Sequence, residues 1–385
     1  MATQLLDAAA ELRRDIVSAR GETEIERQLP QPILDALTEA DLFRMAVPAA
    51  HGGAEADPVE ILGVYQELAR AEPAVAWCVW NSALPSLFGR YLRDDVRETI
   101  FGNPAGRYAG STRPTGRAQR KNGVWRVRGR WSLVSGCMHA DWLALAALEE
   151  EEGGIRMVEP GMPAMRLAFV PVAATRIVDT WHVGGLRGTG SHDVVVEDLD
   201  VPDERTFTPM DPPRMDHPLA RLPIGCFMAL GHAAICLGIA RSGLDELLAL
   251  GRAKVTVDPI PHLPDREANQ ELAGRGGAVL PAMQGRLQEV MGRLWATATA
   301  GEAASPDLLA DAWGAAVTTG RICRELVEEF YEAAGTPALY EDNVLERGLR
   351  DIHAAMQHII AQRTWLQEAG RVAFGMEPVS PLFAL

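Results

Sequence analysis

The sequence lacks the features that direct a protein to nucleic acid or to a membrane. Its 37 Lys and Arg residues are outnumbered by 52 Asp and Glu residues, so the net charge is −15, and no basic block appears. That balance argues against nucleic acid and anionic membranes as partners. No uninterrupted apolar run is long enough to span a bilayer, and the first residues lack the basic and apolar regions of a signal peptide. We therefore expect a cytoplasmic protein.

Cysteines are few and poorly placed for crosslinks or metals. The five are odd in number and scattered without zinc spacing, at Cys78, Cys137, Cys226, Cys236 and Cys323. We predict reduced thiols and no metal site. The chain also shows no internal repeat and no low-complexity tract.

What the sequence contains is typical of a large globular enzyme. Its 385 residues are 47% hydrophobic and 23% charged, enough to bury the cores of two or three domains. Helical periodicity runs through residues 1–104, strand-like segments follow in 105–208, and helices return in 209–385. We predict a mainly helical α+β protein with an N-terminal helical domain, a middle antiparallel β domain and a C-terminal four-helix bundle.

One segment of the N-terminal helices is apolar on nearly every side. It spans residues 74–80 and carries Trp77 and Trp80, so we expect it to be buried. The two indole rings either line a flat aromatic pocket or fill the core, and the pattern alone favours neither interpretation.

The middle segment has the turns and alternation of a compact β domain. Asn122-Gly123 predicts a hairpin turn, and residues 143–146 and 167–171 have the composition of buried strands. The acidic run 149–154 is predicted to be a solvated loop.

Four long helices are predicted after the β domain. They fall at 224–250, within 272–300, at 307–334 and at 346–374. Several glycines and Pro281 indicate that the second helix starts well after residue 272, and the proline-rich loop 255–270 is the most mobile-looking insertion.

The last of these helices carries an apolar stripe at helical spacing. The stripe consists of Leu349, Ile352, Met356 and Ile359. His358 follows Asp351 by about two turns, on roughly the same side. This pattern alone favours a core-facing helix with an ordinary histidine.

Three patches combine polar side chains with glycine or charge. The first, 131–142, runs from a strand into Ser135-Gly136, which we expect to expose a hydroxyl and backbone N–H groups at an edge of the β domain. The second, 181–191, holds four glycines, a cation and two hydroxyls that suit a phosphate or a ring edge. The third is Arg350-Asp351 with His358. The plain alternatives for the first two are a strand-end bulge and a β-turn loop.

Together these patches resemble the oxygenase components of two-component flavin-dependent monooxygenases, which share the acyl-CoA dehydrogenase fold. The resemblance covers essentially the whole chain. It rests on segments 110–118, 129–136 and 179–191, with Arg350-Asp351 and His358. It implies the domain order given above and, usually, a homotetramer.

The resemblance also implies a mechanism. A separate NAD(P)H-dependent flavin reductase supplies reduced FMN or FAD, and O2 adds at flavin C4a to give a C4a-hydroperoxyflavin that hydroxylates the substrate. By resemblance, Ser135 hydrogen-bonds the flavin near N5 and C4a, and His358 reaches the same centre or the substrate. A dry pocket and a neighbouring donor protect such an adduct, and a histidine can move a proton near neutral pH. Further flavin neighbours implied by the resemblance are Ser111, Thr112, Gly136, Trp181, Arg187 and Thr189.

Two competing functions make different demands on the chain. Acyl-CoA dehydrogenases use a glutamate to take a proton from the substrate, but the position after His358 is Ile359, and the alternative position falls in 251–254, which holds no glutamate. A non-catalytic flavin or small-molecule binding protein on the same scaffold would not require Ser135 and His358. Both are therefore less favoured than an oxygenase.

The segment after the tryptophan pair bears on the substrate. Phenol hydroxylases of the resembled family carry a histidine there, whereas residues 81–86 contain none. We expect hydroxylation of an aromatic ring, indole-like first and phenol-like second, with an amine nitrogen or a sulfur also open. Amino-sugar N-oxidation is the alternative within the family. The side chains predicted to hold a flat ring are Trp77, Trp80, Leu84 and Phe88.

Overall fold

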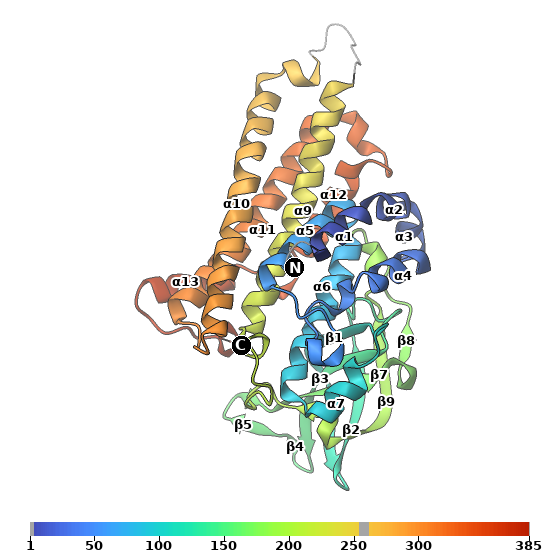
Figure 1. Cartoon of the computed structure of the whole chain (residues 1–385), viewed down its shortest axis with the longest axis vertical. Helices are drawn as coiled ribbons and strands as arrows, with labels where there is room; N and C mark the ends of the chain where they lie inside the picture. Colours follow the sequence, from blue (N-terminus) through green and yellow to red (C-terminus); the bar gives the residue numbers. More distant parts are fainter. Residues whose placement is uncertain (1–3, 254–261, 385) are drawn as a thin grey trace.

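The computed structural model describes residues 4–253 and 262–384 (Figure 1). Helices come first along the chain, strands follow, and long helices complete it. The N-terminal helices are α1 (Gln4–Glu11), α2 (Arg13–Ser18), α3 (Arg20–Glu26), α4 (Gln31–Glu39), α5 (Pro58–Ala71), α6 (Pro73–Phe88) and α7 (Asp94–Phe101). The predicted fold class is confirmed by this order, while the domain limits at residues 104 and 208 stay a prediction.

The strands form one large sheet and one small hairpin. They are β1 (Tyr108–Lys121), β2 (Val124–Trp131), β3 (Trp142–Glu151), β4 (Gly154–Ile155), β5 (Met157–Glu159), β6 (Met162–Pro163), β7 (Met165–Pro171), β8 (Arg176–Val178), β9 (Asp193–Pro202) and β10 (Thr206–Phe207). The large sheet has the order β10-β7-β3-β1-β2-β9-β8, with β4 beside β3, and β5 pairs with β6. The sheet is not wholly antiparallel as predicted, because its central pair, β1 and β3, is parallel.

Two local predictions for the sheet had opposite outcomes. Asn122 and Gly123 join β1 to β2 with φ values of 50° and 83°, as a tight hairpin with both central residues left-handed requires. The predicted solvated loop at 149–154 is wrong, because β3 continues to Glu151. Glu149 is buried there, and its carboxylate pairs with Arg156 at 2.6 Å and with Arg166 at 2.9 Å.

Three long helices and several shorter ones complete the chain. They are α8 (Pro218–Arg221), α9 (Ile224–Arg252), α10 (Glu267–Thr299), α11 (Pro306–Ala334), α12 (Val344–Ala355) and α13 (Thr364–Ala373). The predicted helices at 224–250 and 307–334 are confirmed by α9 and α11. The loop predicted at 255–270 falls partly outside the described residues, and its end is already helical, since α10 begins at Glu267.

The late start predicted for α10 is wrong because tertiary packing outweighs local propensity. Gly276 lies so close to α11 that an added Cβ would stand 2.9 Å from Cζ of Phe330. The glycine that seemed to interrupt the helix thus permits a close approach between two helices.

The predicted fourth helix, 346–374, is also wrong as a single element. α12 ends at Ala355, and His358 has extended backbone angles, with φ −64° and ψ 144°. A short 3-10 turn at Ile359–Ala361 follows before α13. His358 therefore projects from a turn after α12, not from the helical face that carries Asp351.

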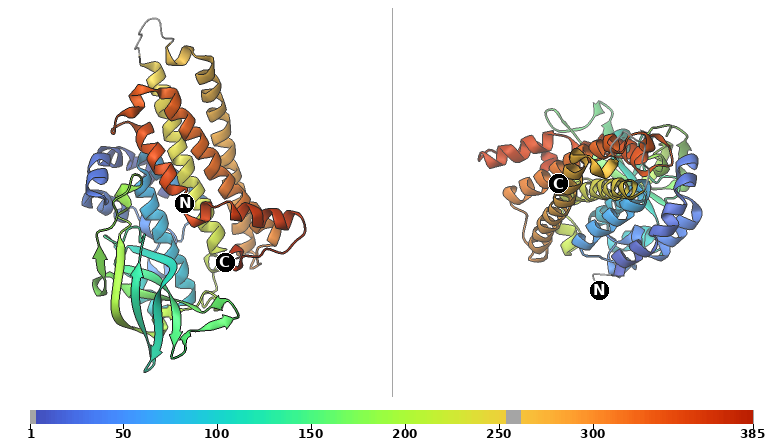
Figure 2. Two further views of the ribbon diagram at one scale, coloured as in Figure 1. Left: turned by 180° about the vertical axis from the view of Figure 1, so that it is seen from behind. Right: turned by 90° about the horizontal axis from the view of Figure 1, so that it is seen from above.

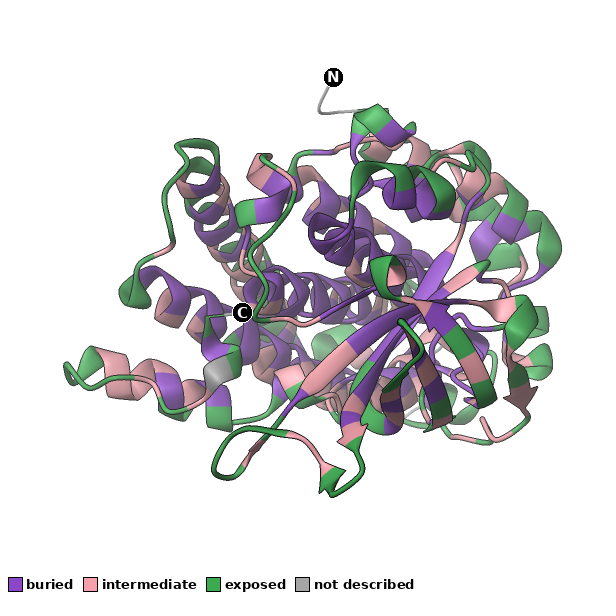
Figure 3. Cartoon of the chain, turned by 90° about the horizontal axis from the view of Figure 1, so that it is seen from below, coloured by how far each residue is buried: buried purple, intermediate pink, exposed green. Residues whose placement is uncertain are grey.

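α6 lies between the sheet and the long helices, so it links the two halves of the molecule (Figures 1 and 2). It contacts β1 on one side and α9 on the other. Its residues 74–80 are all buried, which confirms the prediction for that segment. Seen from below, the buried residues converge where the sheet meets the bundle (Figure 3).

α9 is the core helix of the bundle. Of the described helices, it is the one long and apolar enough to cross a membrane, but 89% of its most apolar window is buried inside the protein. It packs against α5, α11, α10 and α12. The five cysteines are free and buried, two of them on α9.

Candidate active site

The Ser135 backbone and side chain are both held by α6. Trp77 donates from Nε1 to Ser135 Oγ at 3.1 Å, and Asn81 donates from Nδ2 to the Ser135 carbonyl at 2.7 Å. Trp77 and Asn81 lie four positions apart, about one helical turn, so both face the Ser135 loop. The hydroxyl predicted to be exposed at a sheet edge is instead buried beneath α6.

The loop around Ser135 requires a glycine next to it. Gly136 has φ 78°, and an added Cβ would meet His139 Nε2 at 3.0 Å. Its N–H donates to the Thr189 carbonyl at 2.9 Å. Gly136 thus ties the Ser135 loop to the glycine-rich segment 184–191 and does not offer that N–H to a ligand.

His358 approaches the same side of α6 from the bundle. Its ring centroid lies 5.7 Å from that of Trp77 and 5.4 Å from that of Trp80, both edge-on. The structure therefore brings together four of the predicted residues, Ser135, Trp77, Trp80 and His358. Both rings are buried and their N–H groups are hydrogen-bonded, which agrees with the core-filling interpretation, while the pocket interpretation stays a prediction.

A second histidine, not predicted from the sequence, belongs to this cluster. His232, on α9, lies 6.2 Å from His358 between ring centroids and 5.7 Å from Trp77. The available signal was a lone histidine in the otherwise apolar run of α9. Such a histidine is ordinarily a satisfied core residue, so this signal does not distinguish it from one.

Hydrogen bonds fix the same tautomer, with the hydrogen on Nε2, on the two histidines. His232 Nε2 lies 3.0 Å from the Ala355 carbonyl, so Nε2 carries the hydrogen and Nδ1 is bare. His358 Nδ1 accepts from the Ile360 N–H at 3.4 Å, so its hydrogen is on Nε2. His358 can therefore offer an N–H donor from Nε2.

Both imidazoles are neutral at neutral pH. Burial, and then the neighbouring His232, lower the pKa of His358 to about 3. Burial also lowers the pKa of His232 to about 4, against the opposing effect of its bond to the Ala355 carbonyl. His358 therefore acts in this environment as a neutral hydrogen-bond donor rather than as an imidazolium acid.

The segment 181–191 wraps around the Ser135 loop. Thr189 is buried and hydrogen-bonded to Ser191 at 2.7 Å. Trp181 donates from Nε1 to the Leu186 carbonyl at 3.1 Å. Arg187 donates to the Glu24 carbonyl at 3.1 Å and lies 3.3 Å from the Glu24 carboxylate. The arginine predicted as a flavin neighbour is thus paired with the N-terminal helices.

The remaining predicted residues lie apart from the cluster. Among the described residues, no hydrogen bond or ring contact joins Ser111 or Thr112 to Ser135, and Thr112 is exposed on β1. Leu84 is half-buried. Phe88 packs against Phe207, with ring centroids 5.4 Å apart, at the opposite end of α6 from Trp77.

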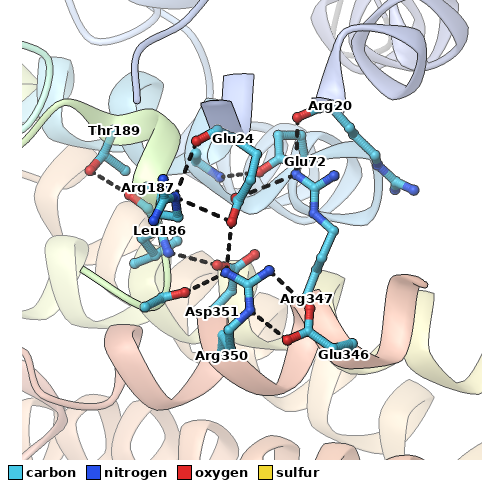
Figure 4. A network of polar contacts seen from close by, with 12 residues as sticks. Arg20, Glu24, Glu72, Leu186, Arg187, Thr189, Glu346, Arg347, Arg350 and Asp351 are labelled. Carbon is cyan, nitrogen blue, oxygen red and sulfur yellow. Dashed lines mark hydrogen bonds and ion pairs between the residues drawn. The ribbon is translucent and has the colours of Figure 1, made fainter. Parts of the chain in front are cut away.

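Arg350-Asp351 belongs to a buried network that anchors segment 181–191 (Figure 4). Asp351 Oδ1 accepts from the Leu186 N–H at 2.6 Å. Arg350 pairs with Glu24 at 2.7 Å and with Glu346 at 2.8 Å. The third patch of the sequence therefore acts on the site from a distance, by holding the backbone of Leu186.

The same network makes a carboxyl group sensitive to pH. Burial, and then the nearby Glu72, raise the pKa of Asp351 to about 7. Arg347, which pairs with Glu72 at 3.0 Å, opposes that shift. The folded protein thus binds this proton more tightly than the unfolded chain between about pH 4 and pH 7.

We expect Asp351→Asn to flatten the pH dependence of stability. Because the pKa of Asp351 is raised on folding, its contribution to the free energy of unfolding falls as pH rises from about 4 to 7 and is constant above that. The asparagine keeps an oxygen for the Leu186 N–H but does not ionise. In urea unfolding, the free energy of unfolding of the wild type should be lower at pH 7.5 than at pH 5. In the variant this decrease should be smaller by about 1–4 kcal/mol. Equal pH slopes in the two proteins would contradict this assignment.

Two segments of the chain match the domains of a known protein family. Residues 2–98 match the acyl-CoA dehydrogenase N-terminal domain, and residues 230–363 match the acyl-CoA dehydrogenase C-terminal domain. The chain belongs to the acyl-CoA dehydrogenase family. The two matched segments flank the sheet and contribute Trp77, Trp80, His232 and His358 of the cluster.

Two curated relatives that cover most of this chain are named monooxygenases. The indole-3-acetate monooxygenase of Acinetobacter baumannii is 27% identical over 373 residues, which are 97% of this chain and 94% of that protein. The flavin-dependent monooxygenase oxygenase subunit HsaA of Rhodococcus jostii is 29% identical, over 88% of this chain and 89% of its own. These names agree with the class of enzyme predicted from the sequence.

Solved structures show the same fold. XiaF from a Streptomyces species, in complex with FADH2 and glycerol, superposes with a TM-score of 0.91 at 24% identity, covering 99% of this chain and 97% of its own. TdsC from Paenibacillus sp. A11-2, in complex with FMN and indole, gives a TM-score of 0.83 at 17% identity, with both chains covered completely. The acyl-CoA dehydrogenase architecture predicted from the sequence is confirmed.

Proposed function

We propose that this family member is the oxygenase component of a two-component flavin-dependent monooxygenase that hydroxylates an aromatic small molecule, first of all one with an indole ring. The observation that carries this proposal is the cluster of Ser135, Trp77, Trp80 and His358, assembled from three separate parts of the chain. The names of the curated relatives support the class of reaction and the aromatic substrate.

The cluster suits a reduced flavin. Its indole rings give flat apolar surface for an aromatic ring system. Ser135 Oγ accepts one hydrogen bond, from Trp77, and so keeps a second lone pair. Among the described residues, none accepts from His358 Nε2, which leaves an N–H donor beside the indoles. An aromatic ligand with both N–H and acceptor positions fits this set.

The proposed chemistry divides between cofactor and protein. Reduced flavin, as FADH2 or FMNH2 from a partner NAD(P)H-dependent reductase, supplies the two electrons that reduce O2, so that one oxygen atom enters the substrate and the other leaves as water. Trp77 and Trp80 exclude water from the reacting centre. His358 holds an oxygen atom through Nε2–H, and Ser135 orients the flavin.

The chain disfavours the dehydrogenase alternative. That reaction needs a carboxylate base at the reacting centre, yet Ile359, at the expected position, is exposed beyond the His358 turn. Asp351 is engaged with the Leu186 N–H. Among the described residues, no carboxylate hydrogen-bonds to Ser135, Trp77 or His358.

His232 does not replace the missing phenol base. Its Nε2 is bonded to the Ala355 carbonyl, and its Nδ1 lies 3.9 Å from Cys236 Sγ. Nε2 is therefore occupied, and burial, which lowers the pKa of His232 to about 4, makes Nδ1 a poor base for a substrate hydroxyl. This supports an indole ring, whose electron-rich carbon is attacked without prior deprotonation, over a phenol.

We further propose that the protein is a cytoplasmic homotetramer. Exposed apolar side chains gather near the end of the chain, including Phe374 at 84% and Val379 at 70% exposure. Large exposed apolar residues of this kind favour association with another protein surface. Mass measurement in solution by light scattering tests the state, and a monomer would contradict it.

Rapid mixing tests the proposed reaction. The protein is loaded without oxygen with reduced FAD, and separately with reduced FMN, and then mixed with oxygenated buffer. We expect a transient absorbance that differs from both reduced and oxidised flavin, and that decays to product when an indole is present. Direct appearance of oxidised flavin, at the rate of free flavin without protein, would remove the main support for an oxygenase.

A further inference from the structure

Ser135 stands at the head of a buried chain of hydroxyl groups. Its Oγ lies 2.7 Å from Ser191 Oγ, which lies 2.7 Å from Thr189 Oγ1. Thr189 Oγ1 donates to the Leu186 carbonyl at 2.8 Å. All three hydroxyl-bearing residues are buried, with exposures of 7%, 3% and 1% for Ser135, Ser191 and Thr189. Bulk water is thus kept away from this chain.

The two ends of this row of hydroxyl groups fix the direction of each hydrogen bond in it. A carbonyl only accepts, so the single hydrogen of Thr189 goes to Leu186. Thr189 must then accept from Ser191, and Ser191 must accept from Ser135. At the other end the Trp77 indole N–H can only donate, which is compatible with a Ser135 hydroxyl that has already given its hydrogen away.

Leu186, the last acceptor, is itself held in place. It adopts a left-handed backbone with φ 52°, and its N–H is fixed by Asp351 Oδ1 at 2.6 Å. Its carbonyl also accepts from Trp181 Nε1 at 3.1 Å. Figure 4 shows Thr189, Leu186 and Asp351 joined in this way. The acceptor at the end of the chain therefore has a fixed orientation.

We propose that Ser191 and Thr189 are positioning residues that commit Ser135 to accept, not donate, a hydrogen bond from the bound flavin, and that the site thereby selects reduced over oxidised flavin. The inference rests on the proposed function, with Ser135 beside flavin N5 as the resemblance implies. Reduced flavin carries an N–H at N5, whereas oxidised flavin carries a bare lone pair there. A Ser135 hydroxyl that can only accept forms a hydrogen bond with the N5–H of reduced flavin. With oxidised flavin, its lone pair faces the lone pair of N5.

This selection suits a protein that receives its flavin from solution. The reduced form must be retained until O2 arrives, and the oxidised form must leave after each turnover. An oriented acceptor lowers the affinity for the oxidised form without weakening the affinity for the reduced one. Neither Ser191 nor Thr189 has to touch the flavin for this effect.

The test is the ratio of two dissociation constants, Kd for oxidised FAD over Kd for reduced FAD, measured by anaerobic titration. Ser191→Ala removes the acceptor of the Ser135 hydrogen, and Thr189→Val removes the acceptor of the Ser191 hydrogen, so in both variants Ser135 becomes free to donate. We expect the ratio to fall about fivefold in each, as for the gain or loss of one neutral hydrogen bond. Thr189→Ser keeps the hydroxyl and should keep the wild-type ratio.

Ser135→Ala separates the possible outcomes. A ratio that falls in Ser135→Ala but stays unchanged in Ser191→Ala and Thr189→Val overturns the positioning role. A ratio that is unchanged in Ser135→Ala as well overturns the contact between Ser135 and flavin N5. Failure of the wild type to bind either flavin, or absence of the transient in rapid mixing, overturns the proposed function itself.

Discussion

Replacing His358 with alanine is expected to lower the yield of hydroxylated product by roughly 10²-fold or more, while folding and reduced-flavin binding stay mostly intact. The reason is that Nε2–H of His358 lies beside Trp77 and Trp80 and has no acceptor among the described residues. Without it, the transient in rapid mixing should be short-lived. Hydrogen peroxide should form in place of the hydroxylated product, because reduced flavin then reduces O2 without oxidising the substrate.

Two variants control this prediction. His353→Ala removes a histidine from the exposed side of α12, where it pairs with Glu328 at 3.0 Å, and should leave product yield unchanged. His358→Asn keeps an N-cap acceptor for the following turn but displaces the donor, so it should resemble His358→Ala. An unchanged yield in both His358 variants would remove the assigned role.

The pH profile supplies an independent check on His358. The lowered pKa values of about 3 for His358 and about 4 for His232 keep both rings neutral above about pH 5. Product yield should therefore show no titration of these groups between pH 5.5 and pH 8.

The second large effect is expected from Gly185→Ala. An added Cβ would stand 2.1 Å from the Arg350 carbonyl oxygen and 2.5 Å from its carbonyl carbon, so rigid backbone must move. Overpacking of this kind costs roughly 1–3 kcal/mol. It would also displace the neighbouring Leu186 N–H from Asp351. We expect a lower midpoint of thermal unfolding, together with weaker binding of reduced flavin.

The adjacent glycine is a matched control. Gly184 is exposed, and an added Cβ there would meet no atom within 4 Å. Gly184→Ala should change stability by no more than about 0.5 kcal/mol. Equal effects of the two substitutions would show that the close approach of Gly185 to Arg350 does not hold the segment.

Prediction from sequence succeeded where one local pattern decides the structure. The burial of α6 is predictable because residues 74–80 are apolar on nearly every side. The helices α9 and α11 are predictable because their runs are long and have few interruptions. Asn122-Gly123 gave the β1–β2 turn because few other dipeptides tolerate two left-handed residues.

Prediction failed where a distant partner decides. Glu149 lies in an acidic run, and only Arg156 and Arg166 make its burial in β3 tolerable. The helical stripe continued through Met356 to Ile359, but the backbone leaves the helix after Ala355, and Ile359 is exposed. In α10, packing against Phe330 reversed the local preference of Gly276.

Only part of the site could be predicted, because several of its contacts also depend on distant partners. Ser135 and His358 were selected by motif resemblance, and the structure brings both to Trp77. No spacing in the sequence places Ser191 next to Ser135, or His232 next to His358, because these contacts join residues far apart along the chain. Arg187 and Asp351 lie in segments selected from the sequence, but their partners show that they hold the site together from outside.

The burial of the five cysteines has a consequence for an enzyme that handles O2. Thiolates, not thiols, are the nucleophiles that react with peroxide. Burial raises the pKa of every cysteine, to about 12 for Cys137 and Cys236, so almost none is ionised at neutral pH. Peroxide that escapes from an uncoupled turnover therefore meets no reactive thiolate in the folded chain, and the cysteines are protected against oxidation by this by-product.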